Sequence, residues 1–336
     1  MNKFKQIIGI DISKHTFDAT FLQVSNSETR HEVFAQNEKG FTAFLKEVQH
    51  AGVATEETLI CLEHTGMYIH PLMDALKICK CFVWVEMPLR IKRSIGLHRG
   101  GDDKLSSLLI AQYALRYQDQ AIAWVVEDSF LQKLRYFTAQ RERLLTSIKQ
   151  LQVPLKELQE IGMKDLSVLL TKTQKKVIKE LEIAVKNIEQ QIQGMLKDNE
   201  EAQKVIQRVC SLKGVSTQTA INLYVYTKGF KTFSNAKQLA CYCGVVPFEK
   251  RSGISIRYKP KVSPYANKNL KRLLHLCAMS AIQCDAELKT YYQRKVAEGK
   301  NKMSALNAVR NKLVLRIFAV VRDGRNYEVN RPYKCA

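Results

Sequence analysis

The distribution of charge along the chain constrains its organisation more than any other feature of the sequence. The 336 residues carry a net charge of +21 at neutral pH. Lys and Arg balance Asp and Glu over residues 1–126, and they exceed them by one over residues 127–203. Residues 204–336 hold 26 Lys and Arg against 6 Asp and Glu. The last part of the chain therefore favours a polyanion as its partner, and nucleic acid fits best.

The length of the chain exceeds the usual size of a single hydrophobic core. Together with the charge distribution, this predicts three domains, which we place at residues 1–126, 127–203 and 204–336. No apolar run is long enough to cross a bilayer, and the N-terminus does not resemble a signal peptide, so we expect a cytoplasmic protein with no membrane association. The nine cysteines include no C-x-x-C pair and are interpreted as reduced thiols.

The first domain has the pattern of an α/β fold. Apolar or alternating segments predict strands, and helical spacing predicts the elements between them. The expected strands cover residues 6–12, 16–24, 32–35, 58–62 and 81–85, and the expected helices cover residues 39–48, 68–78 and 105–117. The order β-β-β-α-β-α-β-α is that of an RNase H-like sheet.

Acidic residues end two of these strands. Asp11 and Glu63 each lie at the carboxyl end of a predicted strand, where an open α/β sheet presents functional groups. Asp103 precedes a helix whose first turn would face the same edge. Three converging carboxylates could hold Mg²⁺, which prefers oxygen ligands. The alternative is that each acid is an ordinary turn residue.

The middle of the chain is rich in Leu, Gln, Lys and Glu. Two helical runs, at residues 129–153 and 177–195, predict a long helical hairpin or coiled coil, with Pro154 interrupting the first run. This arm could be a spacer or a dimerisation element, and ordinary bundle packing within one monomer is the alternative.

The last domain is predicted to be mainly α-helical. Residues 209–220 have the signature of a helix-hairpin-helix, whose turn at Lys213 and Gly214 could hold a DNA phosphate without reading bases. Further helices are expected at residues 235–242, 267–284 and 302–321.

Ser252 lies in a basic segment of this domain that we interpret as a loop. A serine beside a glycine among cations is either a phosphate contact or a nucleophile aimed at a phosphodiester. Arginines around it could clamp a phosphate through bidentate hydrogen bonds. The predicted nucleic-acid-binding residues of the domain are Lys213, Gly214, Lys250, Arg251, Arg257, Lys259, Lys261, Lys271 and Arg272.

Several short motifs occur in one order along most of the chain. They are Gly9-Ile10-Asp11-Ile12-Ser13-Lys14, Glu63-His64-Thr65-Gly66-Met67-Tyr68, Asp103 ahead of Leu109-Ile110-Ala111, Leu212-Lys213-Gly214-Val215, residues 239–247, Ser252-Gly253 and residues 270–274. Together they resemble the DEDD transposases of bacterial insertion sequences, a family that includes the pilin-gene invertase.

The resemblance implies a RuvC-like N-terminal domain, a coiled-coil arm and a C-terminal transposase domain. Asp11, Glu63 and Asp103 would correspond to the first three acids of a metal-binding tetrad. Ser252 would be the nucleophile that forms a phosphoserine link to double-stranded DNA. The resemblance further implies a structured non-coding guide RNA, and a dimer or tetramer assembled through the coiled coil.

The chain departs from the family at one position, where Ser106 stands in place of the fourth acid. A neutral hydroxyl is a weaker ligand than a carboxylate and should reduce the affinity for Mg²⁺. Asp102 is adjacent, but on a helix it would point about 100° away from the required direction. The chain could be a natural variant, a decayed copy or an inactivated one. Two alternatives to a recombinase therefore stay open: a RuvC-like nuclease that uses metal-activated water, and a nucleic-acid-binding protein with impaired catalysis.

Overall fold

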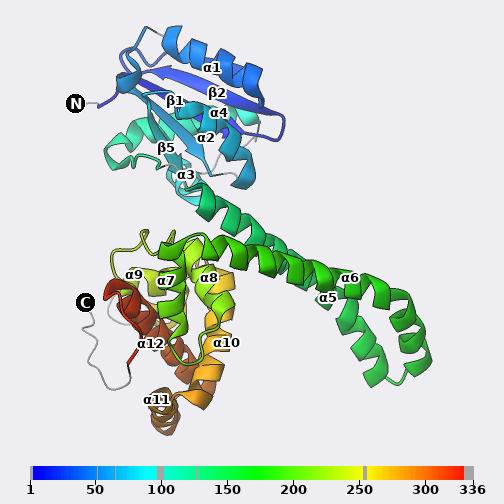
Figure 1. Ribbon diagram of the computed structural model, residues 1–336. Coiled ribbons are helices and arrows are strands. Elements are labelled where there is room, and N and C mark those ends of the chain that lie inside the picture. Colours follow the sequence, from blue (N-terminus) through cyan, green and yellow to red (C-terminus); the bar gives the residue numbers. More distant parts are fainter. Residues whose placement is uncertain are drawn as a thin grey trace. The chain divides into compact units, whose positions relative to one another are not determined.

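The computed structural model describes residues 3–50, 52–64, 66–96, 102–125, 128–252 and 256–328, with the backbone alone for residues 67, 95, 250–252 and 256–259 (Figure 1). The chain divides into two compact units, Met1–Val126 and Glu127–Ala336. None of the helices in the described ranges combines the length and the apolar character that a membrane crossing requires.

The first unit is built on a mixed sheet of five strands in the order β3-β2-β1-β4-β5. Strands β1, β2 and β3 pair in antiparallel fashion, whereas β1, β4 and β5 pair in parallel. This topology is compatible with the RNase H-like domain that the sequence predicts. The strands are β1 (Gln6–Ile12), β2 (Thr16–Gln23), β3 (Thr29–Ala35), β4 (Thr58–Glu63) and β5 (Phe82–Glu86).

Helices cover both faces of this sheet because successive strand residues point to opposite sides. Ile8, Ile10 and Phe17 join the core that includes α1 (Glu38–His50) and α2 (Ile69–Leu76). Ile7 and Leu59, on the other face, join the core that includes α4 (Asp103–Arg116). The short helix α3 (Pro88–Ile95) begins at a proline and was not predicted. Single 3-10 turns lie at Thr55–Glu57, Gly66–Tyr68 and Gln118–Gln120.

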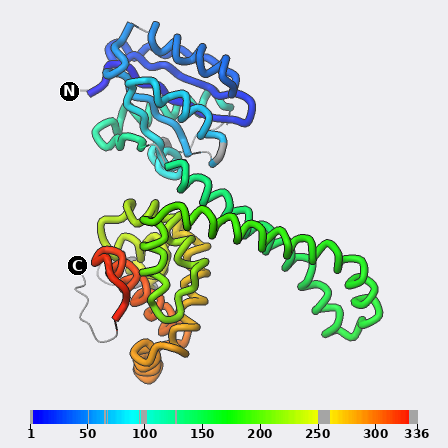
Figure 2. Tube along the Cα trace, viewed as in Figure 1, coloured from blue at the N-terminus to red at the C-terminus, as the bar shows by residue number. Residues whose placement is uncertain are grey.

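The second unit begins with a long helical hairpin. Helices α5 (Ser129–Glu160) and α6 (Lys164–Lys197) lie side by side, as Figure 2 shows. Pro154 lies inside α5, so the prediction that it interrupts the helix was wrong. A proline removes one backbone hydrogen bond, but packing of the rest of the helix against its neighbour sustains it. A coiled-coil geometry for this pair stays a prediction.

The other helices of the second unit share one core that contains Leu212, Leu274 and Val314. They are α7 (Glu200–Cys210), α8 (Thr217–Tyr226), α9 (Ala236–Tyr242), α10 (Lys268–Cys284), α11 (Ala286–Ala297) and α12 (Lys302–Arg322). Helix α11 was not predicted as a separate element. The segment interpreted as a serine loop is instead an antiparallel hairpin of β6 (Pro247–Ser252) and β7 (Ile256–Val262).

Candidate functional site

Four carboxylates form a row across the sheet of the first unit. Asp11 on β1 pairs with Asp18 on β2, and Glu63 on β4 pairs with Glu86 on β5. The two halves of the row meet in the middle, because Asp11 and Glu63 directly follow the paired residues Ile10 and Leu62. Neighbouring residues in register project to the same side of a sheet, which here is the side covered by α4.

The outer acids of the row have hydrogen-bonding partners among the side chains of the protein. The buried Asp18 carboxylate lies 2.7 Å from Nε2 of His31. The buried Glu86 carboxylate accepts hydrogen bonds from the Tyr113 hydroxyl, at 3.0 Å, and from Arg90, at 3.1 Å. These two acids therefore have structural partners. The sequence analysis missed both, because their place in the row depends on the register between strands.

The inner acids, in contrast, repel further negative charge. Burial raises the pKa of the Asp11 carboxyl, the negative charge of Asp103 raises it further, and a hydrogen bond from the Ser106 side chain opposes both effects. Burial also raises the pKa of Glu63, which the cation Lys92 lowers and the charge of Asp11 raises. The structure thus places Asp11 near enough to Asp103 and to Glu63 for their charges to interact, and it places Ser106 beside Asp11.

Helix α4 reaches this position because β1 carries a glycine beneath it. A Cβ atom on Gly9 would overlap the backbone nitrogen of Ala111 and the carbonyl oxygen of Ser107, both on α4. The Ser107 hydroxyl also lies 2.8 Å from the Thr20 hydroxyl on β2. These contacts fix the first turn of α4, and with it Asp103 and Ser106, against the row of acids.

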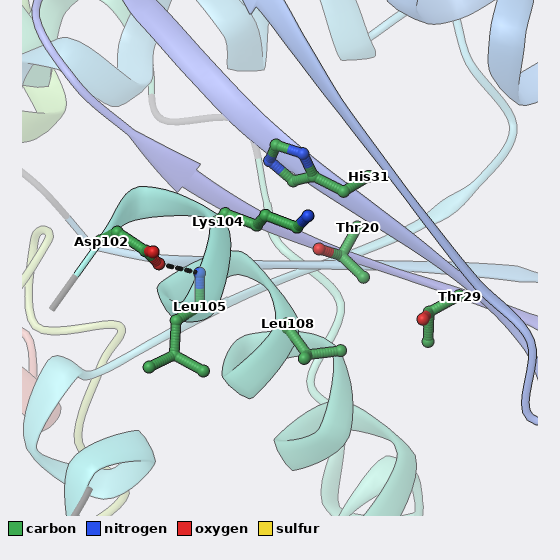
Figure 3. Close-up of a pocket in the computed structure, with 7 residues that line it drawn as sticks. All are labelled: Thr20, Thr29, His31, Asp102, Lys104, Leu105 and Leu108. Atoms are coloured by element: carbon green, nitrogen blue, oxygen red, sulfur yellow. Dashed lines mark hydrogen bonds between the residues drawn. The ribbon is translucent and has the colours of Figure 1, made fainter. Parts of the chain in front are cut away.

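Asp102 has a different role from its neighbour. It is the N-cap of α4, and its Oδ1 accepts a hydrogen bond of 2.6 Å from the backbone nitrogen of Leu105 (Figure 3). With Lys104 and His31 it also lines a pocket of about 400 Å³ between α4 and the outer strands. Because its carboxylate satisfies the helix terminus, Asp102 is not a free substitute for the missing fourth acid.

The donor chemistry of the inner acids suits a divalent cation with oxygen ligands. A bound cation stabilises the ionised forms of neighbouring carboxylates that raise one another's pKa. Asp11 has no cationic partner among the described residues. In the described part of the chain, however, no three acidic, histidine or cysteine side chains lie close enough together to enclose an ion as they stand. Asp11, Glu63 and Asp103 would therefore have to move toward one another to hold one.

The second unit contains the two helices and the turn that were predicted to form a helix-hairpin-helix. Helices α7 and α8 are joined by a turn in which Gly214 has a φ of 88° and lies against Ala281 of α10. A side chain at Gly214 would clash with the backbone there, so this close approach requires glycine. The Lys213 side chain is exposed beside it, and Ser216 caps α8 through the backbone nitrogen of Thr219. The classification of this turn as a helix-hairpin-helix stays a prediction.

Ser252 is the last residue of β6, where its backbone pairs with Ile256. Arg251 pairs with Arg257 in the same hairpin. Gly253 lies outside the described residues, as do the side chains of Lys250, Arg251, Ser252, Arg257 and Lys259. Their contacts with a phosphate stay predictions. The residues themselves lie on a pair of strands rather than in a loop.

The remaining predicted nucleic-acid contacts lie on β7 and α10. Lys261 is exposed at the far end of the hairpin. Lys271 lies beside Gly244, just before β6. Arg272 pairs with Glu142 of α5 at 2.8 Å and so connects α10 to the helical hairpin. About half of the Arg272 side chain stays exposed. Because it is paired with Glu142, it is less available to a phosphate than an unpaired cation would be.

Comparisons with known proteins agree with this organisation. A transposase family of the DEDD type named for IS110 matches residues 8–162, and the transposase IS116/IS110/IS902 family matches residues 206–293. The chain is 25% identical to the pilin gene-inverting protein of Moraxella lacunata over 328 residues, which cover 96% of this chain and 98% of that protein. The pilin gene-inverting protein of Moraxella bovis matches equally well.

A protein of an insertion element gives a shorter match at higher identity. The uncharacterized 43.6 kDa protein of insertion element IS110 from Streptomyces coelicolor is 34% identical over 147 residues, which cover 43% of this chain and 35% of that protein. The two family matches follow one another in the same order as the two units and together span most of the chain. This chain therefore belongs to the IS116/IS110/IS902 family of transposases.

Proposed function

We propose that this protein cleaves and rejoins double-stranded DNA through a covalent phosphoserine link formed by Ser252, with Mg²⁺ bound at Asp11, Glu63 and Asp103. The observation that carries the proposal is the contrast within the row of acids. The outer two have close hydrogen-bonding partners among the protein side chains, whereas the inner two have raised pKa values. Carboxylates with raised pKa values are typical of functional sites.

In each step of the proposed reaction, one phosphoester bond forms while another breaks. The Ser252 Oγ forms an ester bond to phosphorus while one bond from phosphorus to a deoxyribose oxygen breaks. The serine loses a proton, and the departing sugar oxygen gains one. A sugar hydroxyl of another strand then attacks the phosphoserine and restores the diester, so that no energy source or redox partner is needed. Mg²⁺, when bound, offsets the charge that develops on the phosphoryl oxygens.

The second unit supplies the DNA-binding surface in this proposal. Lys213 at the α7–α8 turn and Lys261 on the hairpin are exposed cations in the region that carries the excess of +20. Such a surface binds phosphates with strong dependence on salt. By resemblance to the family, we propose that a structured non-coding RNA supplies the recognition of sequence, whereas the protein contacts mainly backbones.

The helical hairpin supports a homo-oligomer, which we propose to be a dimer or tetramer. The far end of the hairpin exposes several large apolar side chains: Val153, Ile161, Met163, Leu166, Val168, Leu169 and Val177. Ile161 is 69% exposed and Leu169 is 60% exposed, although both lie near the turn of a well-packed hairpin. A cluster of this kind favours contact with another copy of the chain.

The decisive experiment traps the covalent link. The protein is incubated with Mg²⁺, with duplex DNA carrying the ends of its own element and with RNA transcribed from the sequences that flank its gene, then denatured and resolved by gel electrophoresis. We expect a protein–DNA adduct that disappears in Ser252→Ala. Ser255→Ala, which changes a serine three residues further on, is the matched control and should retain the adduct.

The same assay separates the alternatives. A nuclease that uses metal-activated water would nick the DNA without an adduct, and its activity would survive Ser252→Ala. A binding protein without catalysis would retain salt-sensitive binding in Asp11→Asn and give neither nick nor adduct. An adduct that persists in Ser252→Ala would show that another residue is the nucleophile.

A further inference from the structure

Helix α12 places an arginine in an otherwise apolar face. Leu306, Val309, Leu313 and Ile317 recur at helical spacing and are all buried. Arg310 lies on the same buried face and is only 6% exposed. An apolar residue would be expected at this position, because an arginine that is not paired is almost never fully buried.

The charge of Arg310 is not neutralised within the described part of the chain. Its Nε is buried and has no hydrogen-bond partner there, and burial lowers the pKa of its guanidinium. Arg316, two turns further along α12, shows the usual arrangement, since it pairs with Asp285 at 3.0 Å and also with Glu287. A buried charge without such a partner is strongly destabilising, so an anion from outside is expected to complete the site.

Other unsatisfied polar atoms are found on the same two helices. His275 of α10 has a buried Nδ1 without a partner in the described residues, and burial and then the positive charge of Arg310 lower the pKa of His275. Asn311, the next residue of α12, has a buried Oδ1 without a partner. The helices α10 and α12 therefore carry an arginine and a histidine, neither of which is satisfied by the described side chains.

This region is joined to the hairpin that carries Ser252. Asn307, one turn before Arg310, donates a hydrogen bond of 2.7 Å from Nδ2 to the carbonyl oxygen of Val245. Val245 lies two residues before the start of β6. Lys271, one turn before His275 on α10, lies beside Gly244 in the same connection. The base of the hairpin is thus held by the two helices that carry Arg310 and His275.

We infer that Arg310, with His275, forms an anion site at the base of the β6–β7 hairpin that takes a phosphodiester of the bound DNA. The nature of the anion rests on the proposed function, whereas the need for an anion rests on the burial of Arg310 alone. A guanidinium offers donors in a fixed fork that matches two phosphate oxygens. Held there, the phosphate would set the position of the DNA strand relative to the hairpin.

The first test uses inorganic phosphate and requires no catalysis. Thermal denaturation is followed with and without phosphate, at constant ionic strength set by chloride, for the wild type and for Arg310→Met, Arg310→Lys and Lys302→Met. Lys302→Met removes one charge from an exposed position of the same helix. We expect phosphate to raise the melting temperature of the wild type and of Lys302→Met by a few degrees.

Arg310→Met should lose the effect of phosphate and, in phosphate-free buffer, should melt at the same temperature as the wild type or higher, because it removes an uncompensated charge. Arg310→Lys should retain part of the effect. If Arg310→Met melts well below the wild type, or does not fold, Arg310 is already satisfied inside the protein and the inference is wrong. An equal phosphate effect in all four proteins would also overturn it.

The second test measures affinity for duplex DNA as a function of salt. Arg310→Met should weaken binding by about tenfold or more, the scale of a lost hydrogen bond to a charged group. It should also lower the slope of log affinity against log salt by about one phosphate contact. Lys302→Met should change both quantities less. Equal effects of the two variants would reduce Arg310 to one of many surface charges.

The outcomes for this site and for Ser252 are independent. Loss of the phosphate effect in Arg310→Met together with an adduct that survives Ser252→Ala would leave an anion site in a protein with another nucleophile. A Ser252-dependent adduct with an unchanged phosphate effect in Arg310→Met would reject the anion site and leave the proposed function intact.

Discussion

The side chain of Ser106 lies close enough to the carboxylate of Asp11 to oppose the rise in its pKa. The fourth position of the acidic site is therefore occupied by a neutral donor that stabilises its neighbour's negative charge. A fourth carboxylate would instead repel Asp11, as Asp103 already does. Compared with a fourth carboxylate, the serine reduces the repulsion between negative charges in the metal-free site. It also reduces the affinity of the site for a divalent cation.

Ser106→Asp should reverse this balance. The added carboxylate should strengthen Mg²⁺ binding by about tenfold, the usual scale of one charged contact. In the presence of a chelator it should lower the melting temperature, because it adds a further acid to those that already lie near Asp11. Isothermal titration with Mg²⁺ and thermal denaturation in EDTA measure the two effects.

The matched control for this change is Ser106→Asn, which is nearly the size of aspartate but neutral. It should leave the Mg²⁺ affinity at or below that of the wild type. Equal affinities of Ser106→Asp and Ser106→Asn would mean that this position does not face the ion.

Because the pKa of Asp11 is raised, we expect the stability of the metal-free protein to depend on pH. A carboxyl whose folded pKa is raised binds more protons in the folded state, so the free energy of unfolding falls as the pH rises from the ordinary value of 3.8 through the folded value. Above that window the ionised group destabilises the metal-free protein. Asp11→Asn should therefore stabilise the protein at neutral pH in EDTA, by about 0.5–1 kcal/mol.

This gain should shrink as the pH is lowered through the same window, and it should vanish once the wild-type carboxyl is protonated. Asp119→Asn, at an exposed acid of the same unit, is the control and should change stability by less than about 0.5 kcal/mol at any pH. A loss of stability in Asp11→Asn at neutral pH would show that the Asp11 charge is neutralised in the metal-free protein.

The residues of the acidic site that could be predicted from the sequence are those whose pattern lies within one short segment. The strands around Asp11 and Glu63 could be predicted because alternating apolar residues and an acid at the strand end are visible in one short segment. The partners Asp18 and Glu86 could not, since they enter the row only through the register of four strands. The direction of Ser106 likewise depends on how α4 packs over Gly9.

The β6–β7 hairpin was missed for a related reason. Between Phe248 and Lys261 most residues are charged or polar, and Pro260 lies within β7, which argues against a strand. The two strands pair with each other and are not part of the five-stranded sheet, whose buried faces impose the alternation that identifies a strand.

A pair of thiols in the first unit gives a prediction about chemical reactivity. The Cys79 thiol donates a hydrogen bond of 2.8 Å to the Cys81 sulfur, and when Cys79 is ionised the Cys81 thiol donates instead. This bond lowers the pKa of Cys79 to about 7. The rate of alkylation of Cys79 by iodoacetamide should therefore reach half of its maximum near pH 7, since the thiolate is the reactive form. Mass spectrometry of the Cys79 peptide measures this rate.

Substitution of Cys81 separates the hydrogen bond from other causes. Cys81→Ala removes the donor and should shift the midpoint of Cys79 alkylation toward the ordinary value of 9.0. Cys81→Ser retains a hydroxyl donor and should keep the midpoint closer to that of the wild type. If Cys81→Ala leaves the midpoint near neutral pH, then the hydrogen bond is not the cause of the reactivity.

The packing of α4 on β1 should be the most sensitive point of the first unit. Gly9→Ala forces a methyl group into the backbone of Ala111 and Ser107 and should destabilise the protein by about 1–3 kcal/mol, the scale of overpacking. It should also displace Asp103 and Ser106 and weaken Mg²⁺ binding, which isothermal titration detects.

Gly194→Ala is the opposite case, because a Cβ there meets no atom and the glycine lies inside α6. It should stabilise its helix by up to about 1 kcal/mol and leave Mg²⁺ binding unchanged. Denaturant unfolding followed separately for the two units would distinguish the effects, and equal effects of the two substitutions would mean that α4 does not pack closely on Gly9.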